Sequence, residues 1–135
     1  MYSTHRKGEI AQLKVELRAI EKGIVPCRPL VESRFDLILV GEKVEKVQVK
    51  YASYTHHATK NSISVDLRKQ CRNNGKPKKY TKDEVDVVMV YLPEQDCICR
   101  LEANMFHGKS SVNIRLKPAK NGQTKGVLLL EDLVW

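Results

Sequence analysis

Apolar residues recur every three or four positions in the first part of the chain. Between residues 8 and 23 these positions are Ile10, Leu13, Leu17 and Ile20. Lys14, Arg18, Glu21 and Lys22 lie elsewhere on the helical wheel, as in an amphipathic helix. Gly23 follows the last apolar position, and glycine commonly ends a helix because it adopts left-handed backbone angles without strain. The pattern predicts an amphipathic helix over residues 8–23.

Two β-rich runs follow this helix. After a short extended piece from Ile24 to Arg28, the run from Phe35 to Val40 (FDLILV) is largely apolar and stops at Gly41. The next run, from Val44 to Ala52, alternates valines with polar residues, which is typical of a strand with one buried face. Together the two runs predict a β-hairpin.

The remainder of the chain predicts further short strands. They cover residues 62–67, 85–92, 97–101 and 112–116, and an apolar run at 127–130 follows them. A turn after Pro93 separates the runs at 85–92 and 97–101, so we expect both in the same sheet as the hairpin. One helix followed by these strands predicts a single domain, residues 1–135, of the α/β or α+β class with a mixed sheet.

Composition and charge narrow the class of protein. The chain has 135 residues, of which 41% are hydrophobic and 30% charged, and this suits one globular domain. Its net charge of +8 favours an acidic partner, with nucleic acid as the first candidate. No run reaches the roughly 18 uncharged apolar residues that cross a bilayer, and the first residues lack a signal-peptide core. We therefore expect a cytoplasmic protein without a membrane partner.

Asp36 and two residues of the second predicted strand form the candidate chemistry. Gln48 and Lys50 share one face of that strand, and Asp36 joins them if Val40 pairs with Val44 across a loop with an odd number of residues. Metal-dependent phosphodiester hydrolysis needs oxygen ligands and a nearby cation, which these side chains supply. A structural carboxylate beside an ordinary solvent-facing strand is the alternative. An acid inside an apolar run is costly to bury unless paired or metal-bound, and this favours a functional role.

Four stretches of the chain carry a resemblance to a known family. They are GEIAQ (8–12), IVPCRP (24–29), RFDLI (34–38) and VQVK (47–50). The sequence resembles the PD-(D/E)XK nuclease superfamily and, within it, the cyanobacterial group I intron-encoded homing endonucleases, whose PD-(D/Q)XK motif has glutamine at the second acidic position. The resemblance is specific over residues 7–52 and weaker over 85–101. It implies a restriction-endonuclease-like α/β core, with a mixed central sheet, an N-terminal helix and a β-hairpin that carries the active site.

The resemblance also implies a role for each residue of the motif. Asp36 would bind the metal ion, Gln48 would be the second metal ligand, and the backbone carbonyl of Val49 would complete the ligand set. Lys50 would assist the attacking water. Related nucleases carry a glutamate on the first helix, four residues after a glycine, and Gln12 occupies that position here.

Gln12 thus departs from the family pattern. A neutral amide keeps the shape of glutamate but weakens a magnesium site, because hard cations prefer carboxylate oxygens. Either Gln12 is natural, or it replaces a glutamate and leaves this copy inactive. Glu9 and Glu16 lie within one helical turn of Gln12 and could supply the carboxylate instead, with Glu9 the candidate metal ligand.

The implied function is site-specific, Mg²⁺-dependent cleavage of double-stranded DNA by an intron homing endonuclease, with other divalent cations able to substitute. A subunit with one active site must assemble to cut both strands, so we expect a homo-oligomer, either a dimer or a tetramer. Two alternatives remain open. One is a structure-specific nuclease resembling Holliday junction resolvases, and the other is a non-catalytic basic DNA-binding domain.

Basic segments are the expected DNA contacts. Seven basic residues lie among turn-forming residues between positions 68 and 82, which predicts an exposed, mobile loop that contacts phosphates. The candidate DNA-binding residues are His56, His57, Lys60, Arg68, Lys69, Arg72, Lys76, Lys78 and Lys79. Solvated loops without DNA contacts are the alternative for these residues.

Overall fold

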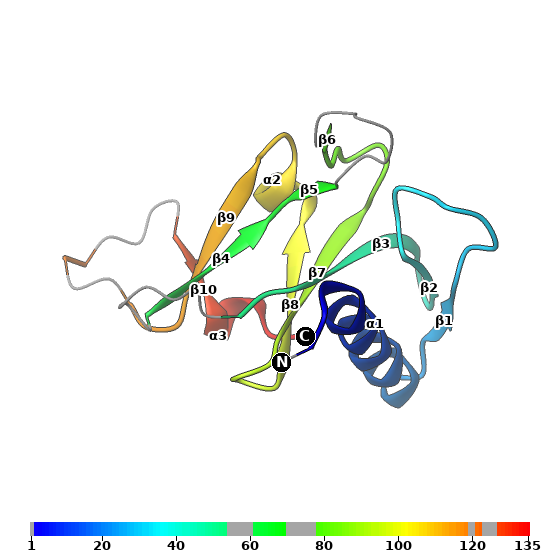
Figure 1. Ribbon diagram of the computed structural model, residues 1–135, viewed down its shortest axis with the longest axis horizontal. Coiled ribbons are helices and arrows are strands. Elements are labelled where there is room, and N and C mark those ends of the chain that lie inside the picture. Colours follow the sequence, from blue (N-terminus) through cyan, green and yellow to red (C-terminus); the bar gives the residue numbers. More distant parts are fainter. Residues whose placement is uncertain (1, 54–60, 70–77, 119–120, 123–126) are drawn as a thin grey trace.

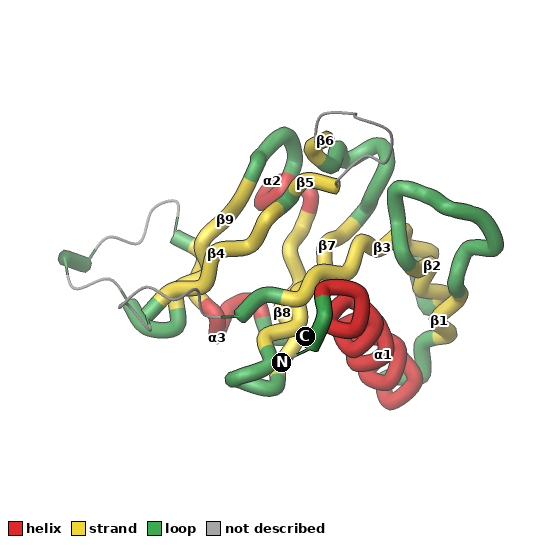
Figure 2. The backbone as a smooth tube through the Cα atoms, viewed as in Figure 1, coloured by secondary structure: helices red, strands yellow, loops and turns green. Residues whose placement is uncertain are grey.

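The structure is a computed structural model that describes residues 2–53, 61–69, 78–118, 121–122 and 127–135. Figures 1 and 2 show how its helices and strands are arranged. In chain order they are α1 (Thr4–Glu21), β1 (Val25–Cys27), β2 (Leu37–Val40), β3 (Val44–Tyr51), β4 (Ser62–Asp66), β5 (Arg68–Lys69), β6 (Lys78–Lys79), β7 (Val87–Leu92), β8 (Cys97–Glu102), α2 (Ala103–Phe106), β9 (Ser111–Arg115), β10 (Leu128–Leu129) and α3 (Leu130–Leu133).

A five-stranded sheet in the order β1-β2-β3-β7-β8 occupies the centre of the fold. Strands β3 and β7 are parallel, whereas the other neighbouring pairs are antiparallel. The predicted mixed α/β sheet with an N-terminal helix is therefore confirmed. The runs predicted at residues 85–92 and 97–101 are β7 and β8, which join the hairpin in this sheet as expected.

The hairpin of β2 and β3 has the predicted register. Val40 pairs with Val44 across a three-residue loop, and Leu37 pairs with Val47. One residue further out, the Asp36 N–H donates to the Val47 carbonyl over 2.8 Å. Because side chains alternate along a strand, Asp36 and Gln48 lie on the same face of the hairpin.

Helix α1 packs on this sheet through small side chains. Ala11, Val15 and Ala19 are fully buried, while Leu13 and Leu17 are more than half exposed, at 53% and 55%. The predicted apolar stripe is thus not the face that meets the sheet. Alanine and valine let the helix axis approach the strands closely, which larger leucines would prevent.

The ends of α1 also differ from the prediction. The helix begins at Thr4 rather than residue 8, because the Ser3 side chain accepts a hydrogen bond from the Arg6 N–H over 3.2 Å and caps the first turn. It ends at Glu21, and Gly23 follows with a φ of 77°. The longer N-terminus carries the first turns of α1 along β3 toward the active-site residues described below.

The two faces of the central sheet have separate cores. On one face α1 packs against side chains of β2, β3 and β7, including Leu37, Val47 and Met89. On the other face a three-stranded sheet, β10-β9-β4, shares a core with β7 and β8 through Ile63 and Ile114. Strand β7 is consequently buried on both faces. No helix of the described residues is long and apolar enough to cross a bilayer.

Candidate active site

Asp36 lies immediately before β2 and is held from three directions. Its Oδ2 accepts hydrogen bonds from Gln48 Nε2 at 2.7 Å and from the Val49 N–H at 3.0 Å. Its backbone carbonyl accepts a hydrogen bond from Gln12 Nε2 over 3.2 Å. The structure thus brings together Gln12 of α1, Asp36 of the preceding loop, and Gln48 and Val49 of β3.

Gln48 is a buried polar residue in the middle of β3, with only 6% of its surface exposed. Its Nε2 donates to Asp36 and also to the Val49 carbonyl at 3.3 Å. Its Oε1 is buried and has no hydrogen-bond partner among the described residues. Leaving a buried amide oxygen unpaired costs about 1–3 kcal/mol, so this side chain is poorly explained by packing alone.

The oxygens around Gln48 fit a hard divalent cation. Asp36 contributes a carboxylate and Val49 a carbonyl, and both accept hydrogen bonds from Gln48 Nε2 in this structure. Turning the amide over would bring its oxygen, which lacks a partner among the described residues, toward these two oxygens. Mg²⁺ binds ligands of this kind. No group of three or more histidine, cysteine or acidic side chains with metal-binding geometry occurs in the described part of the chain, so amide and backbone oxygens have to make up most of any such ligand set.

Lys50 follows two residues after Gln48 and is held at two points. Its Nζ donates to the carbonyl of Arg68, in β5, over 3.1 Å. The same ammonium lies 5.1 Å from the ring centroid of Tyr80, within cation–π range. Tyr80 is fully buried, and burial raises the pKa of its hydroxyl, as does the nearby negative charge of Asp36. Lys50, Tyr80 and Asp36 therefore belong to one site.

Arg34 is a further residue of this site that the sequence analysis did not identify. Its guanidinium lies 4.7 Å from the Tyr80 ring centroid and pairs with Glu84 over 2.8 Å. It also donates to the carbonyls of Lys78 and Lys79, in β6. In the sequence, only its position two residues before Asp36 could have indicated a role for Arg34 in the site. Its contacts with Tyr80 and Glu84 depend on the fold. Nothing in the sequence distinguished Tyr80 from the other tyrosines as a residue of the site.

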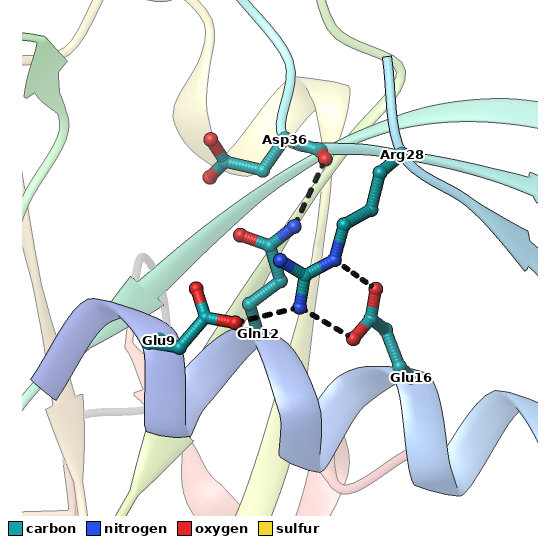
Figure 3. Close-up of polar contacts among 5 residues, drawn as sticks. All are labelled: Glu9, Gln12, Glu16, Arg28 and Asp36. Atoms are coloured by element: carbon teal, nitrogen blue, oxygen red, sulfur yellow. Dashed lines mark hydrogen bonds and ion pairs between the residues drawn. The ribbon is translucent and has the colours of Figure 1, made fainter. Parts of the chain in front are cut away.

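The acidic residues of α1 near Gln12 form ion pairs with Arg28 (Figure 3). Arg28 donates to Glu9 over 2.8 Å and to the two oxygens of Glu16 over 2.7 and 2.8 Å. The hydrogen bonds that Arg28 donates to Glu16 and Glu9 raise the pKa of its guanidinium. Figure 3 also shows the side-chain oxygen of Gln12 on the same side as the Asp36 carboxylate. Glu9 as a metal ligand stays a prediction, and the arginine competes for it.

The predicted DNA-binding residues divide into two groups. His56, His57, Lys60, Arg72 and Lys76 lie outside the described residues. Arg68 and Lys69 form β5, which pairs with Lys78 and Lys79 of β6 as a small antiparallel ladder. The side chains of Lys78 and Lys79 are exposed. Through the Arg68, Lys78 and Lys79 carbonyls, this ladder is bonded to Lys50 and Arg34.

Arg68 is partly engaged within the protein. Its guanidinium pairs with Asp66 over 3.1 Å, and its backbone N–H donates to the same carboxylate over 2.9 Å. Burial opposes ionisation of Asp66, but the hydrogen bonds from Arg68 and the charge of Lys50 lower its pKa overall. Arg68 and Lys50 thus lie close enough to Asp66 to lower the pKa of its carboxyl group.

Comparisons with known proteins agree with this geometry. The sequence pattern described as PD-(D/E)XK endonuclease matches residues 2–133. Among solved structures, that of a bacterial homing endonuclease, I-Ssp6803I, superimposes with a TM-score of 0.73 and 29% sequence identity, covering 92% of this chain and 84% of that one. The search of curated protein sequences gave no match. Because the family pattern spans nearly the whole chain and the solved relative repeats its fold, the chain belongs to the PD-(D/E)XK endonuclease family.

Proposed function

We propose that this nuclease is a site-specific, Mg²⁺-dependent homing endonuclease that hydrolyses both strands of duplex DNA. The observation that carries the proposal is the buried Gln48 amide, which contacts Asp36 while its own oxygen has no partner among the described residues. A buried, half-satisfied amide beside a carboxylate is expected where a cation completes the site. The similarity to the bacterial homing endonuclease I-Ssp6803I supports the homing role.

Asp36, the Oε1 of Gln48 and the carbonyl of Val49 would hold the metal ion, with Glu9 as a further candidate ligand. Magnesium supplies charge stabilisation to the phosphoryl oxygens and lowers the pKa of a coordinated water. Other divalent cations with a preference for oxygen would substitute for it. The Gln12 amide nitrogen donates to the Asp36 carbonyl, and its oxygen lies on the side of the Asp36 carboxylate (Figure 3), so a glutamate at this position would lose one hydrogen bond and add a carboxylate oxygen to the proposed metal site.

Lys50 is the proposed partner of the attacking water and of the scissile phosphate. The Arg68 carbonyl and the Tyr80 ring hold its ammonium at one edge of the site. A fixed cation placed near developing negative charge stabilises the transition state without reorganising at the moment of reaction. Lys50 and the ladder of β5 and β6 would therefore act together when DNA is bound.

Duplex DNA is the proposed substrate, bound by a single domain spanning residues 1–135. The net charge of +8 favours phosphate binding, and Arg68, Lys78 and Lys79 present basic groups beside the active site. The candidates outside the described residues, and Lys69, extend the same basic segment in the sequence. The enzyme would act in the cytoplasm, as a dimer or tetramer.

Cleavage assays on three proteins test this function. The substrate is a candidate intron-insertion-site duplex with Mg²⁺, and the proteins are this chain, its Gln12→Glu form, and that form with Lys50→Ala. We expect Gln12→Glu to increase the cleavage rate by about 10-fold or more, comparable in size to the ~10–100-fold effects of changing residues that support metal ligands, and Lys50→Ala to abolish cleavage. Absence of cutting by all three proteins, with tight DNA binding retained, would instead support a non-catalytic binding domain.

The neutral amides at Gln12 and Gln48 are the specific observation that keeps the non-catalytic alternative in view, because they leave Asp36 as the carboxylate of the motif. A competition assay between a four-way junction and linear duplex separates the homing endonuclease from a junction-specific nuclease. Preference for the linear duplex is the expected result.

A further inference from the structure

Gly8 is a glycine that the fold itself does not require. Among the described glycines, three have positive φ angles that other residues rarely adopt: Gly23, Gly108 and Gly122. At Gly41 a Cβ atom would come within 3.3 Å of the Ile24 side chain. Gly8 lies inside α1 without a positive φ, and a Cβ there would meet no atom of the described residues within 4 Å. Since glycine in a helix interior is less stable than alanine, the reason for Gly8 lies outside the folded chain.

Gly8 contributes to the wall of a hollow beside the active site. The hollow is lined by Thr4, Lys7 and Gly8 of α1 and by Val49, Lys50, Tyr51, Val65 and Asp66 of the facing strands. Its volume is about 320 Å³. Val49 and Lys50 belong to the proposed active site, so Gly8 faces the space next to the proposed chemistry.

The charged groups around this hollow suit a polyanion. Lys7 of α1 and Lys50 of β3 both line it, and the Lys7 ammonium is 5.8 Å from the Tyr51 ring centroid. Asp66 is the acidic residue of the lining, and its carboxylate is bonded to Arg68. With that charge offset, the two lysines dominate the hollow, and a DNA strand passing between them would bring phosphates within reach of both.

We propose that the sugar–phosphate backbone of the bound DNA crosses α1 at Gly8, between Lys7 and Lys50. The missing side chain at Gly8 provides the clearance that lets the backbone approach the helix, a use of glycine that also occurs where protein backbone meets ligands closely. This inference rests on the proposed DNA-cleaving function and adds to it the path of the strand next to the active site.

Substitutions of increasing size at Gly8 test the inference. Gly8→Ala and Gly8→Gln place good helix formers at an open position, so each should raise the melting temperature by about 3 °C. Each should also weaken binding of a fluorescent random-sequence duplex, measured by anisotropy with Ca²⁺ in place of Mg²⁺. We expect a loss of about 5-fold for alanine, at the low end of overpacking costs, and a larger loss for glutamine.

Salt dependence separates steric from electrostatic effects. The Gly8 variants should lower affinity without changing the slope of log K against log salt, because no phosphate contact is removed. Lys7→Gln should reduce that slope by about one. Glu21→Ala is the matched control, since it also favours the helix but lies at its exposed far end. It should raise the melting temperature and keep DNA affinity within about twofold of the unmodified protein, a difference of under 1 kcal/mol.

Each possible result decides the question. Unchanged affinity in the Gly8 variants, with the unmodified protein binding DNA, overturns the inference alone. Failure of the unmodified protein to bind DNA overturns the proposed function and the inference with it. A lower melting temperature in Gly8→Ala would show that the fold requires this glycine, and an equal loss of affinity in Glu21→Ala would assign the effect to helix stability; both would overturn the inference.

Discussion

At the scale of single residues, the burial of Gln48 affects both the stability of the fold and the proposed metal site. Its side chain is 6% exposed and its oxygen has no hydrogen-bond partner in the described part of the chain, which lowers the stability of the folded protein. Its amide nevertheless allows the site to persist without a cation, because Nε2 donates to the Asp36 carboxylate at 2.7 Å. A second carboxylate at this position would lose that hydrogen bond and add like-charge repulsion.

We therefore predict opposite effects of Gln48→Glu with and without a divalent cation. Without cation, thermal unfolding should show a loss of about 1–3 kcal/mol near neutral pH, from two carboxylates in contact. With Mg²⁺ or Ca²⁺, the variant should recover stability and gain more from the cation than the unmodified protein does. Asn113→Asp, an exposed amide-to-acid change on β9, is the control and should show neither effect. A cation-independent melting temperature in Gln48→Glu would contradict metal binding at this site.

At the scale of secondary-structure elements, ion pairs fasten the strands to one another. Arg100 of β8 donates to both oxygens of Glu45 in β3, one of them over 2.9 Å, and also to Glu102. Both side chains of the Arg100–Glu45 pair are largely buried, at 23% and 20% exposure. A bidentate pair of this kind is worth more than an exposed one, and it joins strands separated by β7.

The pair predicts a pH dependence of stability. Hydrogen bonds from Arg100 lower the pKa of Glu45 below its ordinary value of 4.5. A carboxylate with a lowered folded-state pKa stabilises the fold above its unfolded pKa and loses this contribution as pH falls through the folded value. The stability advantage over Glu45→Gln, about 1 kcal/mol near neutral pH, should therefore decline below pH 4.5. Urea unfolding at a series of pH values measures it, and Glu42→Gln on the exposed loop is the control.

The elements also show what could be predicted from the sequence. The hairpin register followed from side-chain parity, since a three-residue loop places Asp36 and Gln48 on one face. The prediction of which face of α1 is buried was wrong. Hydrophobicity favoured Leu13 and Leu17, whereas close packing of the helix on the sheet buries Ala11 and Ala19. The pairing of β4 with β9 joins segments about fifty residues apart, and no local pattern encodes such a partner. The contacts of Arg34 with Tyr80 and Glu84 could not be predicted either, because these residues are also far apart in the sequence.

At the scale of the whole molecule, the proposed function requires more than one copy of the chain. One chain contains one candidate active site, whereas cutting two antiparallel strands needs two. We predict a mass at least twice the 15.5 kDa of one chain in light scattering at the concentration used for cleavage. A monomeric mass that persists on addition of duplex DNA would contradict assembly and, with it, double-strand cutting by a symmetric pair of sites.

The anchoring of β5 and β6 has a consequence for how such an enzyme can change its target. Lys50 is bonded to the carbonyl of Arg68, and Arg34 is bonded to the carbonyls of Lys78 and Lys79. These anchors use backbone atoms, so they are independent of which side chains the ladder carries. Under the proposed function, changes in the side chains of β5 and β6 would therefore alter contacts with DNA while the anchors of Lys50 and Arg34 stay in place.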